Sequence, residues 1–224
     1  MIIKVCGMRE ADNIRAVESV LAETGQTAWM GFIFYKPSPR CCVNRPDYLP
    51  THCKRVGVFV DEAIEEVTKR VQEFGLQVVQ LHGNEDRLYV MQLRQALSQL
   101  RQTAGETAAD WGKVVVKAFQ IKSASDFAAC EPLVGFVDYF LFDTPTAGFG
   151  GSGQQFEWSL LNNYRLMTPF LLSGGIRPDS AEALSQFSHP CWEGIDLNSR
   201  FESAPGVKDI HSLRDFLVML DTAQ

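Results

Sequence analysis

The chain has few of the features that mark a metalloprotein or a disulfide-stapled protein. Its six cysteines show no CxxC spacing, and its four histidines are scattered without an HxxxH pair. Zinc sites and disulfide frameworks need such clusters, so we expect neither of them, and no bound metal. The one adjacent pair, Cys41 and Cys42, is interpreted as a coincidence of loop sequence rather than as a redox switch.

Long apolar runs and an excess of positive charge are also lacking. No apolar run reaches the roughly 18 residues of a membrane span, and the first residues lack the charged start and cleavage site of a secretory signal. The net charge of −6 and the pI near 5.3 argue against a surface for nucleic acid. We therefore expect a cytoplasmic protein that binds neither a membrane nor nucleic acid.

Short apolar segments alternate with amphipathic ones along the 224 residues. Strands are predicted at 2–8, 28–34, 55–60, 77–82, 113–119, 138–143, 169–173 and 192–196. Helical segments are predicted at 10–24, 61–74 with Asp61 as N-cap, 86–102, a short helix opened by Ser123, 158–164, 179–187 and 209–222. A loop over 35–46 is followed by a short, weakly helical stretch.

Eight short strands that alternate with helices predict an α/β protein with right-handed crossovers. We expect a single (β/α)8 TIM barrel, a closed parallel sheet of eight strands, which takes residues 1–224 as one catalytic domain. The alternative is a doubly wound open sheet. Such a sheet usually carries a glycine-rich dinucleotide fingerprint at its first turn, and residues 6–10 have none.

The first strand delivers a thiol to a strand-to-helix loop. Side chains alternate along a strand, so Lys4 and Cys6 share one face while Ile3 and Val5 take the other. A buried lysine needs a partner. We expect Lys4 to lie one layer below Cys6 inside the barrel and to pair with Asp143 or Asp196. An inert core thiol is the alternative interpretation of Cys6.

Active sites of such barrels lie at the C-terminal ends of the strands. Polar residues follow the strands at six such places: Cys6, Arg40, His82, Asp143, residues 173–175 and residues 196–200. The polar segment 103–110 precedes a strand, so it lies at the opposite face and is assigned no function.

Two of these loops predict a site for a phosphorylated substrate. The Ser-Gly-Gly-Ile sequence at 173–176 follows the seventh strand, and Asn198 and Ser199 follow the eighth. These are the positions at which such barrels commonly bind phosphate, since glycine lets backbone N–H groups approach an anion. Residues 144–155, which hold Gly150, Gly151 and Gly153, are interpreted as a lid.

Cys6 and Asp143 stand on strands that are nearly opposite in an eight-membered ring. A thiolate and a carboxylic acid that face each other suit the removal of a proton from carbon and its donation to oxygen. Lys4 or Arg40 would stabilise the thiolate, and Arg40 suits a substrate carboxylate. The alternatives are a loop cap for Asp143, a solvated arginine for Arg40 and a structural hydrogen-bonding role for His82.

Together these motifs resemble the phosphoribosylanthranilate isomerase family of tryptophan biosynthesis. They run in order through nearly the whole chain, at 4–8 (KVCGM), 31–35 (GFIFY), 38–40 (SPR), 56–60 (VGVFV), 79–83 (VQLHG), 142–144 (FDT), 150–153 (GGSG), 156–158 (FEW), 172–175 (LSGG) and 205–209 (PGVKD).

The resemblance implies an Amadori rearrangement of N-(5-phosphoribosyl)anthranilate to 1-(2-carboxyphenylamino)-1-deoxyribulose 5-phosphate, without metal or cofactor. Cys6 would be the general base at the ribose C2 atom, Asp143 the general acid that opens the ring, and Arg40 the ligand of the anthranilate carboxylate. The remaining roles would be phosphate binding by Gly174, Gly175, Asn198, Ser199 and Arg200, support by Lys4, His82 and Asp196, and closure over the substrate by Gly150, Gly151, Ser152 and Gly153. No obligate protein partner is implied.

Two positions depart from the family pattern. Cys41 stands where an aromatic residue commonly follows the arginine, which puts a stacking contact with the anthranilate ring in question. Residues 199–202 read Ser-Arg-Phe-Glu where the family often has Ser-Gly-Val-Glu. Arg200 either adds a direct phosphate contact or crowds the backbone donors, and we favour the first.

Three other functions compete with this interpretation. A sugar-phosphate isomerase of histidine biosynthesis performs the same rearrangement but is expected to have an aspartate at the position of Cys6. An indole-forming synthase would need a lysine-rich acid set at the strand ends. A catalytically silent phosphosugar-binding barrel, or one kept as an assembly partner, would not need Cys6, Arg40 and Asp143 together.

Overall fold

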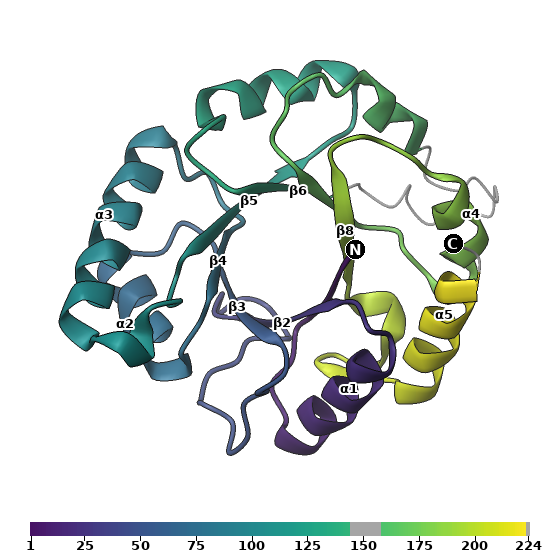
Figure 1. Ribbon diagram of the computed structural model, residues 1–224, viewed down its shortest axis with the longest axis horizontal. Helices are drawn as coiled ribbons and strands as arrows, with labels where there is room; N and C mark the ends of the chain where they lie inside the picture. The colour runs from purple at the N-terminus through teal and green to yellow at the C-terminus, as the bar shows by residue number, and fades with distance from the viewer. Residues whose placement is uncertain (144–157, 223–224) are drawn as a thin grey trace.

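The computed structural model describes residues 1–143 and 158–222. In this part of the chain, eight parallel strands form a closed barrel in sequential order, and the last pairs with the first (Figure 1). The strands are β1 Ile2–Cys6, β2 Thr27–Ile33, β3 Lys54–Phe59, β4 Val78–Leu81, β5 Val114–Gln120, β6 Tyr139–Asp143, β7 Phe170–Ser173 and β8 Trp192–Leu197. The predicted (β/α)8 barrel is confirmed, because an open doubly wound sheet has no pairing between its edges.

Helices surround the ring of strands (Figure 1). The α-helices are α1 Ala11–Glu23, α2 Ile64–Phe74, α3 Arg87–Ala104, α4 Ala181–Gln186 and α5 Ile210–Thr222. Shorter 3₁₀ segments are η1 Glu106–Ala108, η2 Ala124–Leu133, η3 Trp158–Asn163, η4 Pro178–Ser180 and η5 Ser199–Phe201. None of the helices in the described part of the chain is long and apolar enough to cross a membrane.

Two apolar layers hold the barrel, one on each side of the sheet. The outer layer packs strand residues such as Ile3 and Val5 against the helices. The inner layer fills the barrel and consists of Ile2, Trp29, Val56, Val78, Val116, Ala118, Leu141 and Leu171. Strand alternation therefore sends Ile2, Lys4 and Cys6 inward, as the sequence predicts.

The crossover from β2 to β3 contains no helix, so the expected weakly helical stretch after residue 46 is wrong. Backbone N–H groups of this crossover donate instead to a side chain on α1. The buried carboxylate of Glu18 on α1 accepts hydrogen bonds from the N–H groups of Thr51 (2.7 Å) and His52 (2.6 Å), and from the Tyr48 hydroxyl. These bonds satisfy N–H groups that a helix would have bonded to its own carbonyls.

Asp61 is not the N-cap of α2, which begins at Ile64 after Ala63. Asp61 has a left-handed φ of 48°, and its backbone N–H donates to Glu85 at 2.9 Å. Its carboxylate accepts a bond of 3.0 Å from the side chain of Asn84. The residue therefore ties the end of β3 to the loop after β4 instead of capping a helix. Ser123 does cap the short helix it was expected to open, although η2 is a 3₁₀ helix.

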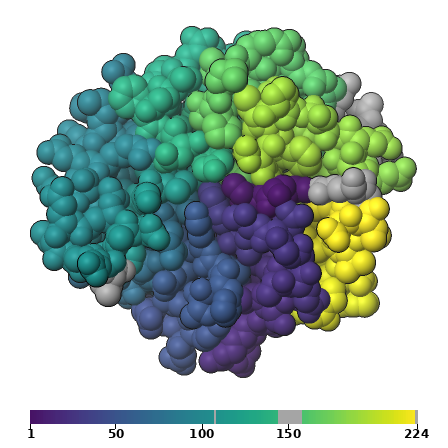
Figure 2. Space-filling model, in the orientation of Figure 1, coloured from purple at the N-terminus to yellow at the C-terminus, as the bar shows by residue number. Residues whose placement is uncertain are grey.

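A small hairpin follows β8 and was not predicted. Its strands are β9 Glu202–Ala204 and β10 Val207–Lys208. The hairpin precedes α5, which lies beside α1 where the ring closes. Figure 2 shows this closure as yellow α5 atoms against the indigo atoms of α1.

Candidate active site

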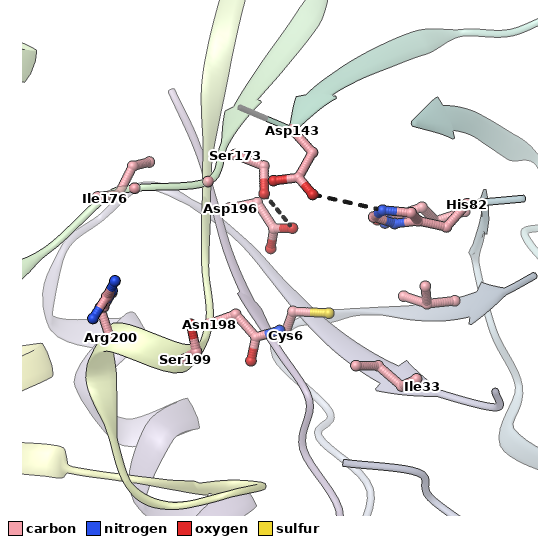
Figure 3. Close-up of a pocket in the computed structure, with 14 residues that line it drawn as sticks. Cys6, Ile33, His82, Asp143, Ser173, Ile176, Asp196, Asn198, Ser199 and Arg200 are labelled. Atoms are coloured by element: carbon pink, nitrogen blue, oxygen red, sulfur yellow. Dashed lines mark hydrogen bonds and ion pairs between the residues drawn. The ribbon is translucent and has the colours of Figure 1, made fainter. Parts of the chain in front are cut away.

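A cavity of about 310 Å³ opens at the C-terminal ends of the strands. It is lined from β1 by Cys6, from β4 by Gln80 and His82, from β6 by Asp143, from β7 and its loop by residues 173–176, and from β8 and its loop by Asp196 and residues 198–200, with Ile33 and Val58 beside them. The side chains of Cys6, Asp143 and His82 point into the same hollow (Figure 3). The sequence predicts the shared face because parallel strands in a barrel all end on one side.

Cys6 is positioned by its strand and by a glycine on the next one. It lies opposite Gly31 in the register of β1 and β2. A Cβ atom at Gly31 would lie 2.7 Å from the Cys6 Sγ, so only glycine leaves room for the thiol there. Cys6 is buried, with 3 % of its surface exposed.

Beneath the thiol lies a buried ion pair. Lys4 Nζ and Asp196 Oδ1 are 2.8 Å apart, and both side chains are buried. The prediction that Lys4 pairs with Asp143 or Asp196 inside the barrel is confirmed, with Asp196 as the partner. Burial acts to lower the pKa of Lys4, but Asp196 and Cys6 outweigh it and the pKa is raised, so Lys4 is a cation.

The charges around Cys6 do not suffice to ionise it in the free protein. Burial raises the pKa of the Cys6 thiol, against the opposing effect of Lys4. The expectation that Lys4 stabilises a thiolate therefore has the right sign, but burial has the larger effect. Cys6 is a thiol at neutral pH in the free protein.

Burial shifts the pKa of Asp143 in the same direction as that of Cys6, and for a carboxyl group this shift suits an acid. Its pKa is raised to about 6, first because burial disfavours the carboxylate and then because Asp196 carries a like charge nearby. Asp143 Oδ2 lies 3.8 Å from His82 Nε2 (Figure 3). Burial lowers the pKa of His82, so its imidazole is neutral.

Gln80 is a cavity residue that sequence reasoning missed. Its side-chain nitrogen lies 3.1 Å from His82 Nδ1. Gln80 lies on β4 and His82 follows the end of that strand two residues later, so the alternation sends both side chains into the cavity. The alternation of side chains along the strand could therefore have identified Gln80 from the sequence. The contact fixes the ring of His82 beside Asp143.

The two loops predicted to bind phosphate line the same cavity. Gly174 and Gly175 have left-handed φ angles of 77° and 68°, which favour glycine and turn the backbone toward the space above β7. Asn198, Ser199 and Arg200 line it from the β8 side. Arg200 lies across the cavity from His82 (Figure 3). All five residues predicted for the phosphate thus lie together.

Arg40 lies apart from the cavity lining. Its guanidinium forms an ion pair with Glu202, with Nη2 2.7 Å from Oε2. Glu202 and its second partner Lys208 were not named as site residues. The expected lid residues Gly150, Gly151, Ser152 and Gly153 lie outside the described residues. Within residues 1–143 and 158–222, no three histidine, cysteine, aspartate or glutamate side chains come close enough together to hold a metal ion.

The fold and the site define a (β/α)8-barrel enzyme whose cavity is lined by a carboxyl group, a thiol and the loops after β7 and β8. A family model described as N-(5'-phosphoribosyl)anthranilate isomerase matches residues 3–218. The chain belongs to this family of isomerases of tryptophan biosynthesis. The relative from Phocaeicola vulgatus is 47% identical over 220 residues, 98% of each chain. The one from Parabacteroides distasonis is 44% identical over 225 residues, which cover 97% of this chain and 92% of that relative.

Solved structures of the same family have the same fold as this chain. The Thermotoga maritima phosphoribosyl anthranilate isomerase matches with a TM-score of 0.72 and 27% identity, covering 99% of this chain and all of that one. A second structure, with a TM-score of 0.70, 26% identity and the same coverage, is a phosphoribosyl anthranilate isomerase in complex with reduced 1-(o-carboxyphenylamino)-1-deoxyribulose 5-phosphate.

Proposed function

We propose that the chain converts N-(5-phosphoribosyl)anthranilate to 1-(2-carboxyphenylamino)-1-deoxyribulose 5-phosphate, with Asp143 as general acid and Cys6 as general base. The observation that carries the proposal is that both groups line one cavity with the two glycine- and asparagine-bearing loops. A phosphate held by these loops fixes one end of the substrate, so that the sugar ring lies between the two groups.

Asp143 acts first in this scheme. Its carboxylic acid gives a proton to the ring oxygen of the ribose, the bond from that oxygen to C1 breaks, and the nitrogen lone pair forms an iminium ion at C1. A pKa of about 6 leaves about a tenth of the Asp143 side chains protonated at pH 7, far more than for an ordinary aspartate. The raised pKa therefore supports the acid role.

Cys6 acts second. The thiolate removes the proton from C2, and the electron pair of that C–H bond neutralises the iminium to give an enolamine. Loss of the C2 hydroxyl proton and gain of a proton at C1 then give the ketone, so the reaction is a net isomerisation. The neutral His82, 3.8 Å from Asp143, supports the acid without adding charge.

The test is the loss of anthranilate fluorescence when the purified chain meets freshly made substrate. We expect turnover by the wild type and a fall of at least about 10²-fold in kcat for Cys6→Ala and for Asp143→Ala. Cys191→Ala, which removes a buried thiol far along the chain, and Asp110→Ala, which removes an exposed carboxylate, are the matched controls and should keep activity. Inactive wild type that still binds a product analogue would instead identify a silent phosphosugar-binding barrel.

We further propose that residues 1–224 act as one catalytic domain that needs no protein partner for turnover. The pairing of β1 with β8 supports this, because it joins the first strand to the last. The same assay on the purified chain tests it: activity that depends on an added protein would contradict the proposal.

A further inference from the structure

The hairpin after β8 carries a buried ion pair that the proposed mechanism does not use. Glu202 Oε1 and Lys208 Nζ are 2.6 Å apart, and their side chains are 4% and 0% exposed. Removing two charges from water is costly, so a buried pair of this kind contributes little net stability by itself. Glu202 has a second charged partner, which is Arg40 in the loop after β2.

Glu202 holds Arg40 by one edge of the guanidinium. Arg40 Nε lies 2.9 Å from both carboxylate oxygens, and Nη2 lies 2.7 Å from Oε2. Lys208 Nζ and the Gly206 N–H, at 3.1 Å, also donate to this carboxylate. Burial acts to raise the pKa of Glu202, but the bonds from Arg40 and Lys208 hold the pKa below its usual value. Glu202 is therefore an anion that accepts hydrogen bonds from Arg40, Lys208 and Gly206.

This cluster lies at the rim of the cavity, beside Cys6. A Cβ atom at Gly7, the residue after Cys6, would lie 3.0 Å from Arg40 Cδ and 2.9 Å from Asn198 Oδ1. Asn198 lines the cavity, and its Oδ1 accepts a bond of 2.9 Å from Lys208 Nζ. Arg40 thus packs against the backbone of Gly7, directly after the strand that carries Cys6 and next to a cavity residue.

Among the described residues, only Glu202 accepts hydrogen bonds from the Arg40 guanidinium, and it does so at one edge. An arginine side chain has five N–H groups in a rigid plane, and the fork to Glu202 engages the Nε edge. No other residue in the described part of the chain accepts a hydrogen bond from this side chain. The Nη1 and Nη2 groups on the far edge form a second fork of the kind that binds a carboxylate by two parallel bonds.

We propose that Glu202 is a positioning residue that fixes Arg40 by its Nε edge, so that the far edge is preorganised for the carboxylate of the anthranilate group. The proposal rests on the proposed function. A long, flexible arginine loses rotamer freedom when it binds, and holding it in place beforehand removes that cost from substrate binding. Lys208 keeps Glu202 in place and joins this fork to Asn198.

Two probes test the proposal by their binding to the purified chain. One is reduced 1-(o-carboxyphenylamino)-1-deoxyribulose 5-phosphate, and the other is its phenylamino counterpart without the carboxyl group. For Glu202→Gln we expect about tenfold weaker binding of the first probe and less than about twofold change for the second. KM should rise by about the same factor with kcat little changed.

Two outcomes would overturn the proposal. Equal weakening of both probes would make Glu202 a general structural residue. Tighter binding of the carboxylated probe would show that Glu202 competes with the substrate for Arg40. Glu23→Gln is the matched control, since it breaks an exposed Nε-edge fork to Arg214 on α5 and should change neither affinity.

The design separates this proposal from the proposed function. Wild-type turnover of the substrate is measured first, and its absence counts against the function rather than against Glu202. If Glu202→Gln does not fold, as judged by its thermal unfolding, Glu202→Asp takes its place. That variant keeps the charge but shortens the reach to Arg40, so it should show the same selective loss for the carboxylated probe.

Discussion

Single residues in the cavity have pKa values that set a pH window for activity. The raised pKa of Asp143, about 6, favours an acid, whereas the raised pKa of the Cys6 thiol opposes a base. The active form needs the carboxyl protonated and the thiol ionised, which is a minor form of the free enzyme. Its fraction is constant between the two pKa values and falls on both sides of them.

We therefore expect kcat/KM to be flat between pH 6 and the pKa of the thiol, and to fall about tenfold per pH unit below pH 6, because Asp143 is already protonated there while the thiol must still lose its proton. Asp196→Asn removes a like charge that raises the pKa of Asp143, so the acidic limb should move to lower pH. Profiles of kcat/KM against pH for both proteins check this. If the acidic limb does not move in Asp196→Asn, the titration that causes this limb belongs to a group other than Asp143.

Substitution of Arg200 tests whether this side chain contacts the substrate phosphate. Arg200 lines the cavity from the exposed part of η5, where the family often has glycine, and a direct contact with the substrate phosphate there is partly screened by solvent. Arg200→Ala should raise KM roughly threefold to tenfold, more at low salt, with kcat unchanged. Arg177→Ala, which makes the same change of charge beside Asp179, is the control. An unchanged KM for Arg200→Ala would contradict the contact.

The sequence predicts cavity residues well where the strands alone decide their position. Cys6 and Asp143 end strands of a parallel barrel and His82 directly follows one, so the fold brings them to one face without further information. The contact of Arg40 with Glu202 joins residues 162 apart, one in the irregular loop after β2 and the other in the hairpin after β8. No periodicity reports which way such loops fold, and this is why Arg40 was placed correctly on its loop but without its partner.

At the scale of elements, the strands were predictable because each is a short apolar run, buried on both faces. The helix boundaries failed where a side chain replaced a backbone partner. Glu18 binds the N–H groups of the segment before β3, and Asp61 joins a neighbouring loop. Both are long-range contacts of polar residues that look, in sequence alone, like ordinary helix formers or caps.

The pairing of β1 with β8 holds an ion pair whose loss is measurable. Lys4→Met leaves the Asp196 carboxylate buried without its cation, which should lower the free energy of unfolding by about 3–5 kcal/mol. Adding Asp196→Asn to Lys4→Met removes the unpaired charge and should recover part of the lost free energy of unfolding. Urea unfolding gives these values. Lys113→Met, which breaks an exposed pair with Asp110, should cost less than about 1 kcal/mol, and an equally small cost for Lys4→Met would contradict burial of the pair.

At the scale of the whole molecule, the barrel depends on a seam between the first strand and the last. β8 pairs with both β7 and β1, and its register against β7 shifts between Phe170 and Leu171. Gly194 follows this irregularity and lies opposite Ile2. Because closure joins the two ends of the sequence, a defect at this seam affects the packing of every strand rather than one loop.

Gly194→Ala should therefore destabilise the entire barrel. A Cβ atom at Gly194 would lie 2.1 Å from the Ile2 carbonyl oxygen, a backbone atom that cannot move without separating β8 from β1. The cost should reach or exceed the roughly 3 kcal/mol at the upper end of ordinary overpacking. Gly25→Ala is the control, because that glycine has no neighbour within 4 Å and only its φ of 64° opposes alanine, at about 1–2 kcal/mol. Urea unfolding followed by circular dichroism and by tryptophan fluorescence should show one coincident transition for each variant, at a lower midpoint for Gly194→Ala. Equal midpoints for the two variants would mean that the seam tolerates a side chain, and that closure does not depend on Gly194.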